Sequence, residues 1–190
     1  MRVPQNALDN PFVLPMLGLL VESPRHQYAL LRELRSRYPF LPAKTSTIYT
    51  LVRSLAQRGF VDLEEADGTE RQQVRLTDAG FADFRERVET QLITGDPNVD
   101  PKFMIALAYI GVLAPKRAAG LLRDRANHLR SDRQALTETL ERPGVQELHM
   151  IEAHFLASRL RHDATWLTHL AERIETGELD WPAPPSKIKV

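Results

Sequence analysis

The chain has 190 residues, a length that predicts one large domain or two small ones, and its 43% hydrophobic and 26% charged content is typical of a folded globular protein. Its 25 basic and 25 acidic side chains cancel, so attraction to an anionic partner requires a local cluster of charge. No cysteine is present, which excludes disulfides and thiolate metal sites. The absence of cysteine fits a reducing cytoplasm, and the apolar stretch Phe12–Val21 is too short to span a bilayer, so we expect a cytoplasmic protein without a membrane partner.

Three helices are predicted in the first sixty residues. The first begins at the Asn-Pro pair of residues 10–11, is restricted by Pro15 to the residues after it, and ends at the Ser-Pro pair of residues 23–24. The second spans about His26–Tyr38, before a turn with two prolines. The third begins near Thr45 and stops at a terminating glycine, Gly59.

A hairpin and a fourth helix follow. Residues 60–64 and 73–76 alternate between apolar and polar side chains, and the Asp-Gly turn of residues 66–69 lies between them. A helix then runs from residue 77 to about residue 92. Three helices and a hairpin in so short a segment predict a winged helix-turn-helix.

The second half is almost wholly helical. A loop rich in Gly, Pro and Asp at residues 94–101 separates it from the first half. Helices are predicted at Pro101–Leu113, Pro115–Glu141 and about Val145–Gly177, with a Pro-Gly turn between the last two. The fold class is therefore mainly α. Its expected parts are a winged helix-turn-helix domain (10–93), a C-terminal helical dimerisation or effector domain (101–177) and a Pro-rich flexible tail (178–190).

The two long helices carry apolar stripes that one hairpin cannot fully cover. Their spacing in steps of three and four is typical of a coiled coil, and a second copy of the chain is the simplest partner. We expect a homodimer interface formed by Leu122, Leu129, Leu136, Leu140, Phe155, Leu160, Leu167 and Ile174.

Positive charge gathers on the second and third predicted helices. Between Arg25 and Phe60 there are seven basic residues and one acid, Glu33. Such a cluster can neutralise the phosphates of a DNA duplex, although a solvated helix face with a chance excess of one sign is the alternative. Residues 61–80, around the predicted wing, hold six acids and two arginines.

The third helix begins with side chains that suit a major groove. Lys44 and the small hydroxyls of residues 45–47 can contact phosphates and base edges without steric bulk, and Arg53 follows further along the helix. Thr45 or Ser46 could instead cap the helix, and Tyr49 could either donate to a phosphate or pack in the core.

The motifs at residues 23–30 (SPRHQYAL), 47–61 (TIYTLVRSLAQRGFV) and 75–80 (RLTDAG) resemble the PadR family of bacterial transcriptional regulators. The second half also resembles the helical C-terminal domain of that family. The resemblance implies a dimeric winged-helix DNA-binding protein, usually a repressor, that responds to small molecules such as phenolic acids or drugs. By position, it implies DNA contacts at Thr47 and Tyr49 and a basic wing residue at Arg71.

Several positions depart from the family pattern. Gln27 and Ser46 replace glycines, Thr50 replaces a proline, and the wing at residues 68–77 lacks two basic residues and both tyrosines. We therefore expect fewer phosphate contacts from the wing. The expected double-stranded DNA contacts, on a palindromic operator, are Arg25, Lys44, Thr45, Ser46, Thr47, Tyr49, Arg53, Arg71, Gln73 and Arg75. The alternative is a winged-helix module that binds a ligand or a protein and not DNA.

An enzyme or a metalloprotein is not indicated. No pair among the six histidines has the i, i+4 spacing of a helical chelate, and no nucleophile motif is present, so we expect no catalytic residues, metal or cofactor. A small aromatic or drug-like effector could bind between Tyr109, His154, Phe155 and Trp166. The alternative is that Phe155 and Trp166 form part of the dimer core.

Overall fold

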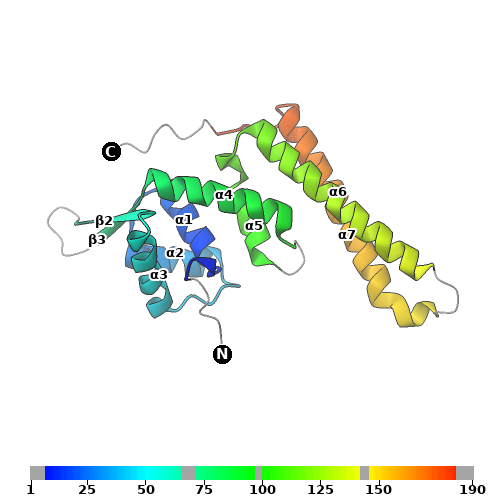
Figure 1. Ribbon diagram of the computed structural model, residues 1–190, viewed down its shortest axis with the longest axis horizontal. Helices are drawn as coiled ribbons and strands as arrows, with labels where there is room; N and C mark the ends of the chain where they lie inside the picture. Colours follow the sequence, from blue (N-terminus) through cyan, green and yellow to red (C-terminus); the bar gives the residue numbers. More distant parts are fainter. Residues whose placement is uncertain (1–6, 66–71, 97–99, 142–145, 183–190) are drawn as a thin grey trace. The chain divides into compact units, whose positions relative to one another are not determined.

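The computed structural model describes residues 7–65, 72–96, 100–141 and 146–182 (Figure 1). Within these ranges the chain forms two compact units, residues 7–88 and 89–182. The boundary falls inside helix α4 (Asp78–Thr94) and not in the 94–101 loop that the composition indicated. The mainly α fold class, with a winged helix and C-terminal helices, is confirmed.

The first unit combines helices with a small antiparallel sheet of strand order β1-β3-β2. Its elements are η1 (Ala7–Asp9), α1 (Val13–Glu22), β1 (Arg25–His26), α2 (Gln27–Arg37), α3 (Thr45–Gln57), β2 (Val61–Glu65), β3 (Gln72–Leu76) and most of α4. The sequence predicted the β2–β3 wing but missed β1, because two residues are too few to show an alternating pattern. The predicted turn at residues 66–69 lies outside the described residues.

The prediction that Pro15 limits the first helix was wrong. Pro15 is the third residue of α1, where the backbone N–H has no intrahelical acceptor and its loss costs nothing. Gly59 ends α3 as predicted, with a φ of +71°. Its N–H donates to the Ala56 carbonyl and the next N–H donates to the Leu55 carbonyl, which closes the end of the helix.

Helix α3 packs through one face only. The core lies around α1, which is buried along almost its whole length, and α3 contributes four buried side chains, Ile48, Leu51, Val52 and Leu55. These four follow the i, i+3, i+4, i+7 spacing of one helical face. The opposite face of α3 is therefore left to solvent.

A close contact joins the wing to α4. The Thr77 hydroxyl donates to the Gly59 carbonyl at 2.7 Å and accepts from the Gly80 N–H at 3.0 Å, so it caps α4. A Cβ on Gly80 would lie 2.0 Å from the Phe60 carbonyl oxygen. The Thr-Asp-Ala-Gly motif thus fixes the base of the wing against the first turn of α4.

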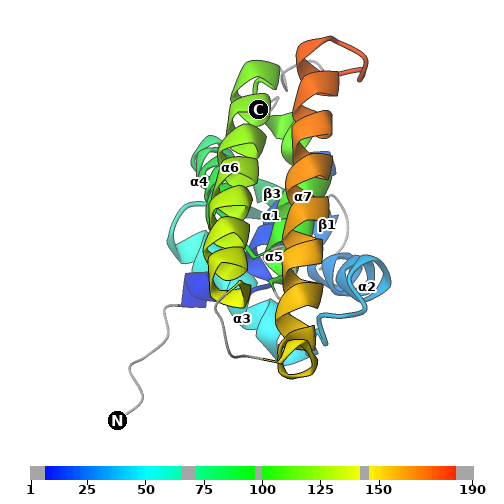
Figure 2. The ribbon, with the colours of Figure 1, turned by 90° about the vertical axis from the view of Figure 1, so that its right-hand side faces the viewer.

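The second unit contains an antiparallel pair of long helices, α6 and α7 (Figure 2). Its elements are the end of α4, α5 (Pro101–Ala108), η2 (Ile110–Val112), α6 (Pro115–Leu140), η3 (Glu147–Met150) and α7 (Ile151–Glu175). The single helix predicted for residues 101–113 is broken at Tyr109, whose φ of −109° and ψ of 15° leave the helical region before a 3-10 turn. The Pro-Gly turn predicted at residues 143–144 lies outside the described residues.

Five of the eight residues expected at the dimer interface are buried within one chain. Leu122, Leu129, Leu160, Leu167 and Ile174 are at most 8% exposed. Leu136 and Leu140 are half-buried, and Phe155 is exposed. The expectation that the buried five meet a second copy therefore needs correction, because a partner could reach them only after the hairpin opened.

Candidate nucleic-acid interface

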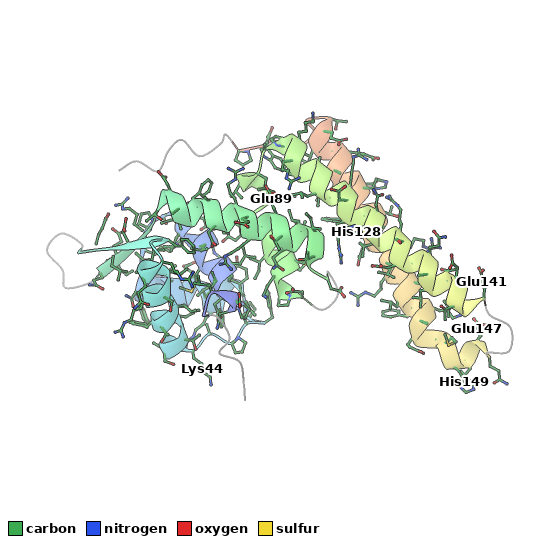
Figure 3. The ribbon with its side chains drawn as sticks, viewed as in Figure 1. Lys44, Glu89, His128, Glu141, Glu147 and His149 are labelled. Atoms are coloured by element: carbon green, nitrogen blue, oxygen red, sulfur yellow. The ribbon has the colours of Figure 1, made fainter. Side chains whose placement is uncertain are left out.

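The solvent face of α3 is polar and carries no acid. Its exposed side chains are Thr45, Ser46, Tyr49, Thr50, Arg53 and Gln57. No Asp or Glu occurs between residues 44 and 58. Lys44 occupies the N-cap position, next to the partial positive charge of the helix N-terminus (Figure 3). This end of α3 therefore combines a cation, small hydroxyls and a helix dipole of the same sign.

The hydroxyls at the start of α3 do not cap the helix. The first helical residue is Thr45, and the N-cap side chain makes no capping hydrogen bond. Thr45 and Ser46 are exposed, Thr47 is half-buried, and Tyr49 is 38% exposed. The alternative roles considered above, a cap for Thr45 or Ser46 and the core for Tyr49, are thus not what the structure shows.

Three basic side chains on and beside α3 are not paired with an acid in the described part of the chain and can contact an anion. In the described ranges no carboxylate forms an ion pair with Lys44, Arg53 or Arg58. All three are exposed. A free cation next to an acid-free helix face can contact a phosphate without first breaking an internal pair.

Other arginines of the predicted cluster have structural partners. Arg25 donates to the Leu19 carbonyl at 3.2 Å and to Glu22 at 3.1 Å, which ties β1 to the end of α1. Arg37 also pairs with Glu22, at 2.5 Å. Arg35 donates twice to the Ala43 carbonyl, at 3.1 and 3.0 Å, and so holds the turn before α3. Arg25, expected to contact DNA, is thus engaged in contacts with the end of α1.

The wing presents a neutralised arginine. Nε of Arg75 on β3 lies 3.0 Å from each carboxylate oxygen of Glu64 on β2. Gln73 is half-buried and stands in register between His26 on β1 and Glu64. Arg71 lies outside the described residues. Sequence reasoning missed the role of Glu64, although the hairpin register, once fixed, places the two charges diagonally across the strands.

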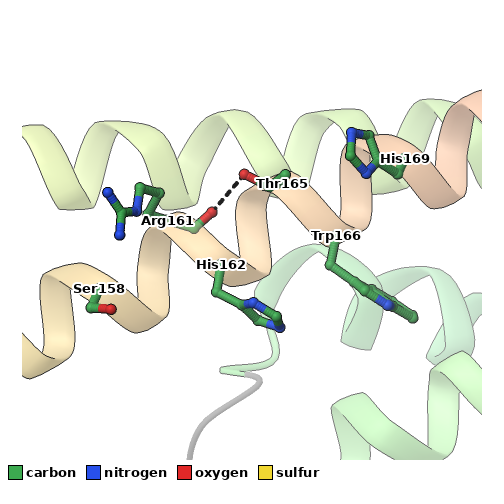
Figure 4. Close-up of a pocket in the computed structure, with 6 residues that line it drawn as sticks. All are labelled: Ser158, Arg161, His162, Thr165, Trp166 and His169. Atoms are coloured by element: carbon green, nitrogen blue, oxygen red, sulfur yellow. Dashed lines mark hydrogen bonds between the residues drawn. The ribbon is translucent and has the colours of Figure 1, made fainter.

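One of the four residues expected to bind an effector, Trp166, lines a groove on α7. A groove of about 430 Å³ runs along α7 and is lined by Ser158, Arg161, His162, Thr165, Trp166 and His169 (Figure 4). Trp166 is the one expected residue in it; Tyr109, His154 and Phe155 are not among its lining side chains.

The described part of the chain holds no cluster of His, Asp or Glu that could bind a metal ion. None of the described helices has the length and hydropathy to cross a membrane.

Three helices packed on a two-stranded wing, with an exposed and acid-free face on the third helix, define the class of winged helix-turn-helix proteins. Residues 16–86 match the model of the transcriptional regulator PadR-like family. Comparison with curated proteins gave no significant match.

Several solved structures of transcriptional regulators are similar to the chain. Bacillus subtilis PadR in complex with operator DNA has 22% identity and a TM-score of 0.40, over 87% of this chain and 99% of that one. Bacillus subtilis PadR in complex with p-coumaric acid has 21% identity and a TM-score of 0.36, over 87% and 99%. A PadR-like regulator from Bacillus cereus has 16% identity and a TM-score of 0.38, over 87% and 98%.

Proposed function

We propose that the chain is a cytoplasmic, non-enzymatic transcriptional regulator that binds double-stranded DNA with α3 in the major groove. The observation that carries this proposal is the acid-free, solvent-exposed face of α3 with its free cations Lys44 and Arg53. Phosphate neutralisation by such cations supplies sequence-independent affinity, and the small polar side chains between them can contact base edges. The match of residues 16–86 to the model of a family of transcriptional regulators supports the same function.

The regulator is proposed to act as a homodimer on a palindromic operator. In the described part of the chain, large apolar side chains remain exposed on η3 and α7: Leu148, Ile151, Phe155, Leu156 and Trp166. Ile151 and Phe155 are 56% and 63% exposed and one helical turn apart, so a second copy can cover both. A two-fold dimer presents two copies of α3 to two half-sites.

Repression and release by a small aromatic molecule complete the proposal. The α7 groove offers one aromatic wall, Trp166, together with Arg161, whose cation suits a carboxylate. An effector releases the operator only if it binds the DNA-free state more tightly than the DNA-bound state. Thermal unfolding with p-coumaric acid, the compound in one Bacillus subtilis PadR structure, tests for an effector of this class.

DNA binding is tested by fluorescence anisotropy with a duplex from immediately upstream of the gene that encodes the chain. Lys44→Ala and Arg53→Ala should each weaken binding and each flatten the dependence of log K on log salt by about one phosphate contact, a slope of about 0.9. Lys116→Ala, at an exposed lysine of α6, is the matched control and should change neither. Binding unaffected by Lys44→Ala and Arg53→Ala would instead favour the alternative, a ligand-binding or protein-binding module with a winged-helix fold.

A further inference from the structure

Arg75 on the wing lies among acids. Its Nε donates to both carboxylate oxygens of Glu64, and Asp62 is its direct partner in the β2–β3 ladder. Val74 and Leu76 on either side of Arg75 are buried. Because successive residues of a strand point to opposite faces, Arg75, Glu64 and Asp62 share the outer face of the sheet.

The outer face of the wing therefore differs from the solvent face of α3. Two carboxylates surround the one arginine that the structure describes on the wing, so a phosphate approaching Arg75 meets a net charge of about −1. The side chains of Arg75 and Glu64 are 33% and 47% exposed, so the pair is open to solvent and to an approaching duplex. On α3, by contrast, the described cations have no acidic neighbour in sequence from residue 44 to residue 58.

We propose that Glu64 is a specificity-determining residue that neutralises Arg75 and prevents this arginine from adding sequence-independent affinity for DNA. Contacts to phosphates carry no sequence information, whereas contacts to base edges do. Wing strands whose one described arginine is neutralised add little affinity of this kind and leave discrimination between sites to α3. The inference rests on the proposed DNA binding and names the residue that limits its non-specific component.

The test is a double-mutant cycle in the full-length chain, with a duplex of random sequence and anisotropy measured over a range of salt concentrations. Glu64→Gln keeps the size and an oxygen acceptor but removes the negative charge. It should tighten random-sequence binding by roughly three- to ten-fold at low salt and steepen the salt slope by about 0.9, the value of one added phosphate contact. Arg75→Ala alone should change little, and adding it to Glu64→Gln should abolish the gain.

Glu86→Gln is the matched control, because it removes one exposed acid of α4 and raises the net charge equally. A smaller gain for Glu86→Gln than for Glu64→Gln supports the inference. An equal gain in the two variants, a gain that survives Arg75→Ala, or weaker binding by Glu64→Gln each overturns it. If the wild-type chain binds through Lys44 and Arg53 but Glu64→Gln binds no tighter, the inference about Glu64 fails and the proposed function stands. If the wild-type chain binds no duplex, both fail.

Discussion

The indole Nε1–H of Trp181 donates a 2.8 Å hydrogen bond to the backbone carbonyl of Leu113, at the end of η2. Pro182 follows and lies over Gly111, where a Cβ would come within 2.9 Å of the proline ring. The segment expected to be flexible from residue 178 onward is thus attached to the second unit as far as Pro182. Residues 183–190 lie outside the described part of the chain.

This attachment predicts a stability role for Trp181. Trp181→Ala should lower the free energy of unfolding by about 1–3 kcal/mol, because it removes a hydrogen bond and a half-buried aromatic ring. Trp181→Phe keeps most of the ring and should cost less, about 1 kcal/mol, the value of one neutral hydrogen bond. Chemical denaturation of the two variants and the wild type measures both, and equal stability of Trp181→Ala and the wild type would contradict the assigned role.

The wing base gives a second prediction. Gly80→Ala should destabilise the chain by about 1–3 kcal/mol, because the new Cβ must displace the Phe60 backbone. Gly120→Ala on α6 is the control: nothing lies within 4 Å of its added Cβ, and alanine should stabilise the helix by up to about 1 kcal/mol. Opposite shifts in the midpoint of thermal unfolding are expected. A stable Gly80→Ala variant would show that the contact with Phe60 yields easily.

A third prediction concerns the stability of the chain at acidic pH. Glu175 on α7 accepts from Nε of Arg123 on α6 at 3.0 Å, and this hydrogen bond holds the pKa of Glu175 below its ordinary value of 4.5. The contact therefore stabilises the chain above pH 4.5, and its contribution is lost as the pH falls through the lowered pKa. Because the pair is exposed, the effect should be small.

Thermal midpoints of the wild type and Glu175→Gln, measured from neutral to acidic pH, provide the check. The wild type should be slightly more stable at neutral pH, and the two curves should converge in acid. A difference that stays constant over the whole pH range would mean that the charge of Glu175 does not contribute.

The exposed apolar residues of α7 give a fourth prediction. Phe155→Glu should shift the chain from dimer to monomer, because it places a charge in the surface proposed to meet the second copy. Glu152→Gln, at an exposed residue one turn earlier, is a control that should leave the mass unchanged. Light scattering after size-exclusion chromatography measures both. A monomeric wild type would reject the proposed dimer, and a dimeric Phe155→Glu variant would reject this surface.

Local sequence determined the order and type of most elements. Gly59 marks the end of α3, and Pro101 and Pro115 are the first residues of α5 and α6. The alternation of apolar and polar residues in 60–64 and 73–76 marks the wing. The motifs at residues 47–61 and 75–80 fall within the segment that matches the PadR-like family. These signals act between residues a few positions apart, so they can be recognised without knowing the path of the chain.

Only the tertiary structure decided which of the predicted side chains are available. Arg25 and Arg75 looked equivalent to Arg53, yet the first two pair with Glu22 and Glu64, while the described residues hold no acid paired with the third. The periodicity of the long helices likewise identified apolar stripes but not what covers them. The fold can pair a charged side chain or cover an apolar face with a group that lies far away in sequence. A paired charge or a covered face is then not available to bind a partner.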